Sequence, residues 1–473
     1  MRAKFGNHSF AASAVILLFL INCHAQKDVT SKIDNYIKAE MQSQRIPGLS
    51  LAVIKNGQII LAKGYGFANV EHQVSVKPET VFQSGSIGKQ FVATAMMMLV
   101  EEGKLSLDDK ISQYFADAPE SWKNITLRHL LSHTSGMGDY PTDYDLRRDY
   151  TEDELVKMIK AQPLGFQPGE KWSYSNLGFI TLGILIHKIT GKFYGDFLAE
   201  RIFKPLGMNT ARIISEEDIV QNRAAGYRLV SRELKNQEWV APLVNTTADG
   251  SLYLTILDMA KWDAALDTEK LLKKSSLDQM WMPPALSGGK TSNYGFGWFA
   301  GKFHGHRIVY HGGTWQGFKS FIARFLDDKL TIVFFANLLQ TNESKLMRGL
   351  ASVFYPEFAL PDVQPIEEKE SDVKTLARKV LLQLMDNKLD KNLFTSEMQA
   401  SFPPDRARQM SENLNSLSLP IAIIYSTTEL IKRKEENNFR IYRYMLTDLG
   451  ATWFFTLKLT KDNKIAGIAL QPK

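Results

Sequence analysis

The sequence predicts an α+β fold, in which helices flank an antiparallel sheet and a mostly helical segment interrupts it. Two groups of strand-like segments support this prediction, one within the first 70 residues and one between residues 296 and 337. The residues between the two groups have mainly helical periodicity, and separate blocks of strands and helices are typical of α+β proteins. A change of composition near residue 360 predicts a second, smaller α+β domain.

The N-terminal hairpin has the clearest local signal. Residues 33–44 have the periodicity of an amphipathic helix, and segments 49–55 and 58–67 have the character of strands. Asn56-Gly57 joins these two strands, and this dipeptide is the strongest short-range hairpin signal. An antiparallel sheet is therefore expected to begin here.

The helical insert and the later strands follow in order. The expected helices are 86–102, 127–132, 152–161 and 176–190, two of which are followed by glycine, a common helix terminator. The expected strands are 296–299, 307–310, 318–325 and 330–337. Asp327-Asp328 is expected to form a tight turn between the last two strands. The terminal hairpin and these strands are expected to form one sheet.

A linker is predicted over residues 361–371, after a first domain over residues 26–360, because prolines and a charged run occur together there. Residues 372–473 are then expected to form a small α+β domain of unknown role. Its expected elements are a helix at 373–385 and strands at 421–425, 440–446, 453–459 and 464–470. This segment contains no cysteine and no histidine, so a structural or docking role is expected there rather than metal or nucleophilic chemistry.

The composition excludes several classes of protein. Hydrophobic residues make up 44% and charged residues 23%, which excludes a disordered or fibrous chain. The net charge is +6 without a Lys/Arg block, so no nucleic-acid partner is predicted. The single cysteine, Cys23, excludes an internal disulfide and a cysteine-rich metal site. The nine histidines include no H-E-x-x-H pair, and neither a metal nor another cofactor is predicted.

Residues 1–25 have the pattern of a secretory signal peptide. Arg2 and Lys4 precede an apolar run over residues 10–21, which is too short to span a membrane. Cleavage is expected near Ala25, which predicts a secreted or periplasmic protein. The residues before Cys23 also resemble a bacterial lipoprotein cleavage box, so a lipid anchor at Cys23 is one alternative and an uncleaved anchor is another.

Ser86 and Lys89 are the first candidate residues for chemistry. They lie three residues apart at the start of a predicted helix, so the hydroxyl and the amine share one helix face near the positive end of the helix dipole. Such a pair suits an activated nucleophile. The alternative is that Ser86 only caps the helix and Lys89 extends to solvent. Ser84 occupies the first glycine position of a G-x-S-x-G elbow, which weakens an α/β-hydrolase interpretation.

Two further motifs contain candidate residues for the same chemistry. Tyr174-x-Asn176 lies on a loop before an apolar helix, and it offers a proton carrier and a hydrogen-bonding amide. The segment His311-Gly312-Gly313-Thr314 is expected at the end of a strand, where glycines let a substrate approach the backbone. Taken singly, the tyrosine also fits a core residue and the glycines also fit a turn.

In their order, the motifs S-x-x-K, Y-x-N and H-x-G resemble those of the serine penicillin-recognising hydrolases, the family of class C β-lactamases and DD-peptidases. The stretches 130–136, 168–169 and 294–298 also resemble that family. The resemblance covers about residues 30–355 and leaves out the C-terminal segment. It implies a β-lactamase/transpeptidase-like fold for the first domain.

The resemblance also implies catalytic roles. Ser86 would attack a carbonyl and form an acyl-enzyme, while Lys89 and Tyr174 would handle its proton. Asn176 would orient the acyl side chain, and the backbone N–H groups of Ser86 and Thr314 would hold the oxyanion. Free lysine and tyrosine have pKa values near 10, so a base at neutral pH requires a buried pocket that lowers the pKa.

The third motif departs from the usual Lys-Thr-Gly, because His311 and Gly312 replace the cation and the hydroxyl, whereas Gly313 is kept. A substrate carboxylate would lose a charge and a hydrogen bond here. Members of the family with H-x-G are described as esterases, D-amino-acid peptidases and other hydrolases, and this chain resembles that branch. An alternative is that His311 acts as the base toward Ser86. His133 and Ser135 are expected to shape a loop rather than to react.

The expected function is that of a secreted serine hydrolase that cleaves ester or amide bonds of small-molecule or peptide substrates, D-amino-acid peptides included. One alternative is a β-lactamase or DD-carboxypeptidase that acts on β-lactams or cell-wall peptides. Another is a penicillin-recognising binding module without turnover. Residues 245–252 are a candidate wall of the substrate pocket.

Overall fold

The computed structural model describes residues 28–231, 233–289, 291–359, 366–386, 388–402, 404–415, 428–436, 438–447 and 452–472. The expected signal peptide, with Cys23, lies outside the described residues. Within the ranges given, no helix is both long enough and apolar enough to cross a membrane.

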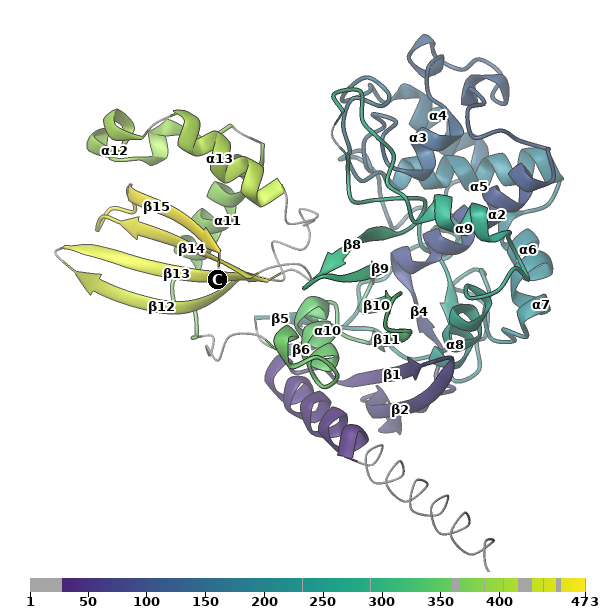
Figure 1. Ribbon diagram of the computed structural model, residues 1–473, viewed down its shortest axis with the longest axis horizontal. Helices are drawn as coiled ribbons and strands as arrows, with labels where there is room; N and C mark the ends of the chain where they lie inside the picture. The colour runs from purple at the N-terminus through teal and green to yellow at the C-terminus, as the bar shows by residue number, and fades with distance from the viewer. Residues whose placement is uncertain are drawn as a thin grey trace, which may run out of the picture.

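A seven-stranded antiparallel sheet forms the centre of the first domain (Figure 1). Its strands, in sheet order, are β3 (Val74–Ser75), β2 (Gln58–Asn69), β1 (Gly48–Lys55), β11 (Leu330–Ala336), β10 (Phe318–Phe325), β9 (His306–Trp315) and β8 (Phe299–Phe303). β1 pairs with β11 in a register that sets Leu49 opposite Ala336. The N-terminal hairpin and the later strands therefore form one sheet, and the predicted α+β fold is confirmed.

β9 is longer than the sequence predicts. It continues to Trp315 instead of ending at Tyr310, so the segment 311–314 lies within a strand rather than at a strand end. The strand continues because β10 pairs with it along this stretch, with Ser320 opposite Gly313. The two glycines of the motif therefore permit close packing here and do not make a turn.

β8 begins later than predicted. The predicted strand covers residues 296–299, whereas β8 begins at Phe299. Gly297 has a φ of +74°, which lies in the left-handed region and interrupts an extended chain. The residues before β8 are therefore irregular, and Phe296 and Trp298 are buried in the core.

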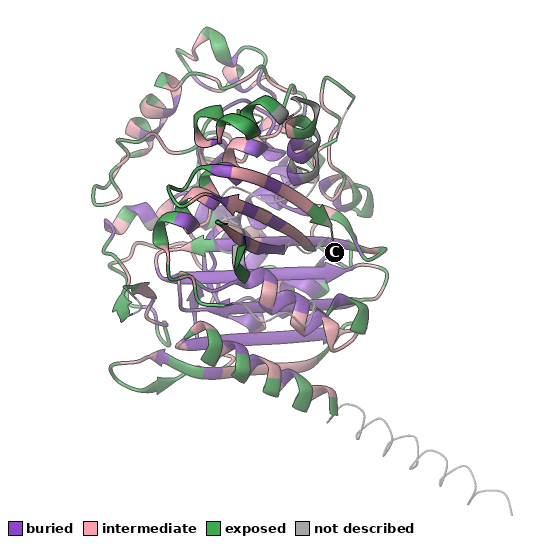
Figure 2. Cartoon of the chain, turned by 90° about the vertical axis from the view of Figure 1, so that its left-hand side faces the viewer, coloured by how far each residue is buried: buried purple, intermediate pink, exposed green. Residues whose placement is uncertain are grey.

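Both faces of the sheet are buried. Along β11, Val333 lies in one core and Ile332 and Phe334 lie in the other, because side chains alternate along a strand. The first core includes the apolar residues of the helical insert, and the second includes those of helix 28–44 and α10 (Glu343–Ser352). Figure 2 shows the central strands coloured as buried along most of their length.

The helical insert lies between β3 and β8. Its helices are α2 (Gly88–Glu101), α3 (Leu127–Leu131), α4 (Glu152–Ala161), α5 (Asn176–Thr190), α6 (Tyr194–Leu198), α7 (Lys204–Leu206), α8 (Ile256–Ala265) and α9 (Lys274–Met280). Its 3-10 helices are η1 (Gly85–Ile87), η2 (Ile111–Gln113), η3 (Glu120–Trp122) and η5 (Pro242–Thr246), and η4 (Ala199–Phe203) is a π-helical segment. Two small strand pairs complete it, namely β4 (Phe82–Gln83) with β7 (Tyr253–Leu254), and β5 (Tyr227–Val230) with β6 (Glu233–Asn236).

Local signals fix the ends of α4 and α5, which have the predicted bounds. The Thr151 side chain accepts a hydrogen bond from the Glu154 N–H and completes a capping box at the start of α4. Ser175 caps α5 by accepting from the Gly178 N–H, and Gly191 ends α5 with a φ of +69°.

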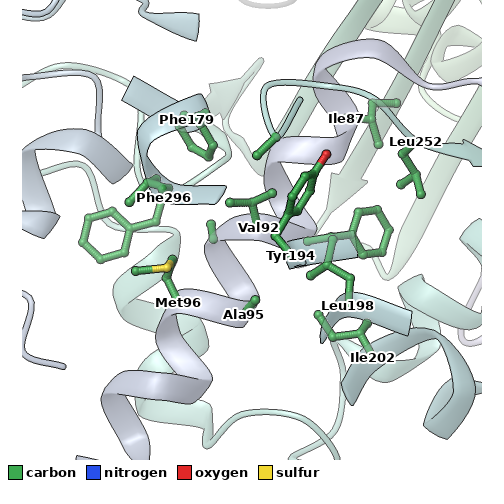
Figure 3. Close-up of a cluster of buried hydrophobic side chains, with 14 of the residues drawn as sticks. Ile87, Val92, Ala95, Met96, Phe179, Tyr194, Leu198, Ile202, Leu252 and Phe296 are labelled. Carbon is green, nitrogen blue, oxygen red and sulfur yellow. The ribbon is translucent and has the colours of Figure 1, made fainter. Parts of the chain in front are cut away.

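α2 is the central helix of the insert. Its residues from Gly88 to Leu99 are all buried. Figure 3 shows apolar neighbours around this helix, among them Phe179 of α5, Tyr194 of α6 and Phe296. A helix that is apolar on all sides is a buried helix, so any polar residue in it is enclosed as well.

A separate C-terminal domain has its own hydrophobic core. Its helices are α11 (Ser371–Met385), α12 (Ser396–Ser401) and α13 (Pro404–Asn415), and its sheet runs in the order β12 (Thr428–Glu436), β13 (Phe439–Thr447), β14 (Thr452–Leu459), β15 (Ile465–Pro472). The predicted helix and the last three predicted strands are present, and the predicted strand 421–425 lies outside the described residues. The sequence does not indicate β12, because residues 432–436 are all exposed and show no apolar alternation.

The residues before α11 contact this C-terminal sheet. The Ile366 N–H donates to the Leu430 carbonyl oxygen at 2.7 Å, and the Tyr442 hydroxyl donates to Glu370 at 2.8 Å. The Tyr444 hydroxyl donates to Glu368 at 2.8 Å. Part of the segment expected to be a linker is therefore hydrogen-bonded to the small domain.

Candidate active site

Ser86 lies in η1, at the start of α2. It is the only residue from 81 to 90 that is not buried, so this stretch reaches accessible space at Ser86. Gly85 has a φ of +54°, and a Cβ added to it would lie 2.6 Å from the backbone nitrogen of Thr314. Glycine is required at position 85, because it accepts both the left-handed backbone and the close approach of β9.

Lys89 lies one turn into the same helical segment and is fully buried. Its Nζ donates to Ser86 Oγ at 3.1 Å, to Asn176 Oδ1 at 2.7 Å and to the backbone oxygen of Asp249. The amine also lies 5.0 Å from the centre of the Tyr174 ring. Lys89 therefore does not extend to solvent, and its hydrogen-bond partners are neutral groups.

The environment of Lys89 favours its neutral form. Burial lowers the pKa of Lys89 to about 8, and the charges of Asp249 and Asp139 oppose this fall. An ordinary lysine has a pKa near 10.4. The pKa of Lys89 therefore lies much closer to neutral pH than the pKa of an exposed lysine, as a general base requires.

Tyr174 is the second predicted proton carrier. Burial raises the pKa of Tyr174 well above its ordinary value, an interaction with the Ser86 hydroxyl opposes the rise, and the charges of Asp249 and Asp139 add to it. Its hydroxyl is buried and has no hydrogen-bond partner of good geometry among the residues that the structure describes. Tyr174 is therefore protonated at neutral pH, which suits a proton donor better than a base.

Asn176 connects Lys89 to a carboxylate. Its Oδ1 accepts from Lys89, and its Nδ2 donates to Asp139 Oδ1 at 2.9 Å. Asn176 is the first residue of α5, and the cap formed by Ser175 fixes that helix start. The Ser175 hydroxyl also donates to the Gly138 carbonyl oxygen at 2.6 Å, and this hydrogen bond holds the loop that contains Asp139 against the start of α5.

His311 lies in β9 and is buried. Its Nδ1 lies 2.6 Å from the Gly312 carbonyl oxygen, which can only accept, so Nδ1 carries the proton. Its Nε2 lies 2.9 Å from the Tyr294 hydroxyl and accepts from it. Burial lowers the pKa of His311 to about 3, although the hydrogen bond with Gly312 opposes the fall. His311 is therefore neutral with both nitrogens engaged, which disfavours a role as base toward Ser86.

Gly313 lets β9 pack closely against the start of α2. A Cβ added to Gly313 would lie 1.9 Å from the Ser84 carbonyl oxygen, so a larger residue does not fit. The next residue, Thr314, has its backbone nitrogen beside Gly85. The backbone N–H groups of Ser86 and Thr314 thus lie on neighbouring segments, as the two donors of an oxyanion hole require.

The comparison with protein families agrees with this arrangement. A family model described as Beta-lactamase matches residues 33–352, which is more than half of the chain. The chain belongs to the beta-lactamase family. It is a serine hydrolase of that family, and the predicted resemblance is confirmed.

A curated relative shares sequence with this member of the beta-lactamase family over most of the first domain. Penicillin-binding protein 4* of Bacillus subtilis (strain 168) is 28% identical over 342 residues, which cover 68% of this chain and 75% of the relative.

Two solved structures share its fold. A D-amino acid amidase from Ochrobactrum anthropi SV3 has a TM-score of 0.62 at 24% identity, covering 70% of this chain and 100% of that chain. An octameric penicillin-binding protein homologue from Pyrococcus abyssi has a TM-score of 0.60 at 21% identity, covering 94% of this chain and 98% of that chain.

Two carboxylates beside the site are not singled out by the sequence. Asp139 accepts from Asn176, and Asp249 supplies the backbone oxygen that binds Lys89. The Tyr140 hydroxyl donates to Asp249 Oδ2 at 2.5 Å. Asp249 falls within the candidate pocket wall 245–252, but it binds Lys89 through a backbone atom, and no side-chain pattern signals such a contact.

His133 supports Tyr174 from the loop that follows α3. Its Nδ1 accepts from the Ser175 N–H at 3.1 Å, and its ring centre lies 4.2 Å from that of Tyr174. Ser135 Oγ accepts from the Met137 N–H at 3.2 Å and closes a turn in the same loop. Both contacts shape the loop, as the sequence predicts. In the described ranges no cluster of three or more His, Cys, Asp or Glu residues could hold a metal.

Proposed function

We propose that this protein hydrolyses ester or amide bonds through an acyl-enzyme on Ser86. The observation that carries the proposal is the hydrogen bond of 3.1 Å from the buried Lys89 amine to the Ser86 hydroxyl. A lysine with a pKa of about 8 is neutral in about one molecule in ten at pH 7, against about one in 3,000 for an ordinary lysine. The base form of Lys89 is thus several-hundred-fold more populated.

The reaction follows from these positions. Neutral Lys89 takes the proton of Ser86 as Oγ bonds to the substrate carbonyl carbon, and the N–H groups of Ser86 and Thr314 stabilise the oxyanion. When the C–O or C–N bond breaks, Tyr174 gives its proton to the leaving group and regains one from Lys89. Water then attacks the acyl-enzyme, which releases the acid and restores the Ser86 hydroxyl.

The third motif makes β-lactams and peptides ending in a carboxylate the less favoured substrates. Neutral His311 and Gly312 supply neither the cation nor the hydroxyl that would bind a carboxylate, and a lost charge-assisted hydrogen bond weakens binding by about 1.5–3 kcal/mol. The curated relative's name, a penicillin-binding protein, keeps penicillin acylation as the second candidate. One of the structurally similar proteins is named as a D-amino acid amidase, which supports amides as one substrate class for this chain.

The test is the intact mass of the protein after brief mixing with p-nitrophenyl acetate and, separately, with penicillin. We expect an acetyl adduct on the wild type that clears with turnover, and none on Ser86→Ala. Ser84→Ala is the matched control, since Ser84 is the neighbouring serine and should keep the adduct.

An adduct retained by Ser86→Ala would contradict the proposal, and an adduct with penicillin alone that does not clear would instead support a binding module. Rapid turnover of penicillin would support the β-lactamase alternative.

We also propose that residues 1–25 direct secretion, to the periplasm or the medium, and that the hydrolase spans residues 26–360, followed by a linker at 361–371 and the small domain at 372–473. The mass of protein recovered from the periplasm of an expressing cell tests the leader. A chain beginning at Gln26 supports cleavage after Ala25, whereas a lipid-modified chain beginning at Cys23 supports the lipoprotein alternative.

A further inference from the structure

Asp249 has two different partners beside the Ser86 site. Its backbone oxygen accepts a hydrogen bond from the Lys89 amine, whereas its carboxylate oxygen Oδ2 accepts from the Tyr140 hydroxyl at 2.5 Å. Asp249 is only 7% exposed, and in the described part of the chain its other carboxylate oxygen, Oδ1, is buried without a hydrogen-bond partner. The residue that binds the proposed base therefore also carries a buried carboxylate with a single donor.

An ion pair between this carboxylate and the Lys89 amine would remove the base. Both groups are buried, and a buried charge is stabilised by an opposite charge in direct contact. The charge of Asp249 already favours the protonated form of Lys89 without such a contact. A direct pair would hold the proton on Lys89 more firmly, so the hydrogen bond from Tyr140 to Oδ2 decides which partner the carboxylate has.

Tyr140 is held in place by a stack of tyrosine rings. Its ring centre lies 4.5 Å from that of Tyr144, and the Tyr144 ring centre lies 4.8 Å from that of Tyr150, with both pairs stacked. Burial and the charge of Asp249 raise the pKa of Tyr140 well above its ordinary value. The Tyr140 hydroxyl therefore stays protonated, and it remains a donor at the pH values at which Lys89 titrates.

The other titratable groups around Lys89 and Asp249 do not supply a second cation. Asp139, the other carboxylate that acts on Lys89, is exposed and accepts from Asn176. Burial keeps the neighbouring rings neutral, because it lowers the pKa values of the histidines and raises those of the tyrosines, namely His133, His311, Tyr144, Tyr174 and Tyr194. Among these groups, Lys89 is the one cation with which the Asp249 carboxylate could pair.

We propose that Tyr140 is a positioning residue for the base, whose hydroxyl keeps the Asp249 carboxylate from forming an ion pair with Lys89. The inference rests on the proposed role of Lys89 as the base for Ser86. Without the hydroxyl, rotation of the Asp249 side chain would bring the carboxylate to the amine that the backbone oxygen of the same residue already contacts. With it, Lys89 keeps neutral partners, and its proton is free to leave.

The test is the pH profile of pre-steady-state acylation by p-nitrophenyl acetate in Tyr140→Phe, which keeps the ring and removes only the hydroxyl. We expect the midpoint to rise by about one pH unit and the rate at pH 7 to fall about ten-fold, because a directly paired lysine holds its proton more firmly. The rate at pH 10 should approach that of the wild type, since the neutral amine is then the same base. A role in packing alone would lower the rate at every pH.

Removal of the carboxylate should reverse the effect. In Tyr140→Phe/Asp249→Asn the midpoint should return to that of Asp249→Asn, because no ion pair can form. Tyr140→Phe/Asp143→Asn should keep the raised midpoint, since Asp143 is an exposed residue of the same loop and its replacement changes the net charge equally. Tyr144→Phe is the matched control for the hydroxyl, because Tyr144 is the next ring of the stack, and its profile should match that of the wild type.

A midpoint that is unchanged or lowered in Tyr140→Phe, or one that stays raised in Tyr140→Phe/Asp249→Asn, would overturn the positioning role and leave the hydrolase intact. An absence of acyl-Ser86 in the wild type, or a wild-type pH transition that persists in Lys89→Met, would overturn the proposed function itself.

Discussion

Lys89 and Lys319 are both buried lysines of the first domain, and their surroundings differ in one respect. Lys319, in β10, forms an ion pair with Glu343 at 3.3 Å, and both side chains are less than a tenth exposed. Lys89 is completely buried and donates only to a hydroxyl, an amide oxygen and a backbone oxygen. The comparison shows that Lys319 has a carboxylate partner, whereas Lys89 has only neutral hydrogen-bond partners. Burial lowers the pKa of Lys89, which leaves its proton available for chemistry.

The largest expected effect is the loss of acylation activity when Lys89, but not Lys319, is replaced. Lys89→Met should lower acylation of Ser86 about a hundred- to ten-thousand-fold, because the general base is lost. Its stability should fall less than that of Lys319→Met, because the Asn176 and Asp249 oxygens lose a donor but no ion-pair partner is left uncompensated. Stopped-flow acylation by p-nitrophenyl acetate and thermal unfolding of the same sample measure both quantities. A fully active Lys89→Met that is destabilised as much as Lys319→Met would contradict the comparison.

Lys319→Met should show the reverse pattern. Removing one partner of a buried pair leaves the Glu343 carboxylate uncompensated, which costs about 3–5 kcal/mol of the free energy of unfolding. The fraction that remains folded should still acylate at Ser86. Urea unfolding gives the loss, and the double variant Lys319→Met/Glu343→Leu should recover much of it. If Lys319→Met abolishes acylation in folded protein, Lys319 is not merely structural.

The smallest expected effect is on the proton affinity of Lys89. The charge of Asp249 holds up the pKa of Lys89, so Asp249→Asn should move the midpoint of the acylation pH profile to lower pH. Asp143→Asn should leave the midpoint in place. An upward movement in Asp249→Asn would show that Asp249 does not act on Lys89 through its charge.

The elements that follow from the sequence are those with local signals. The Asn56-Gly57 hairpin, the capping box of Thr151 and the cap of Ser175 are each fixed by neighbours in the chain, and these turns and helix starts appear where they are predicted. The end of β9 is less accessible to prediction, because two glycines resemble a turn until the packing of Gly313 against the Ser84 carbonyl oxygen is known.

The sequence predicts only those features of the candidate site that depend on residues close together in the chain. The spacing of Ser86 and Lys89 indicates a shared helix face, but the burial of Lys89 depends on helices far away in the sequence. Asp249 is 160 residues from Lys89 and binds it through a backbone oxygen, which any residue could provide. The sequence therefore does not predict that the carboxylates of Asp139 and Asp249 lie at the site, because only the fold brings them there.

The central claim is that Lys89 is the base for Ser86, and the pH dependence of acylation tests it most directly. The pre-steady-state rate of acylation by p-nitrophenyl acetate, measured in the wild type, should rise with pH through a midpoint near 8, because Lys89 becomes neutral there. Lys89→Met should lose this transition. A rate independent of pH from 6 to 10, or a midpoint near 8 that persists in Lys89→Met, would contradict the account.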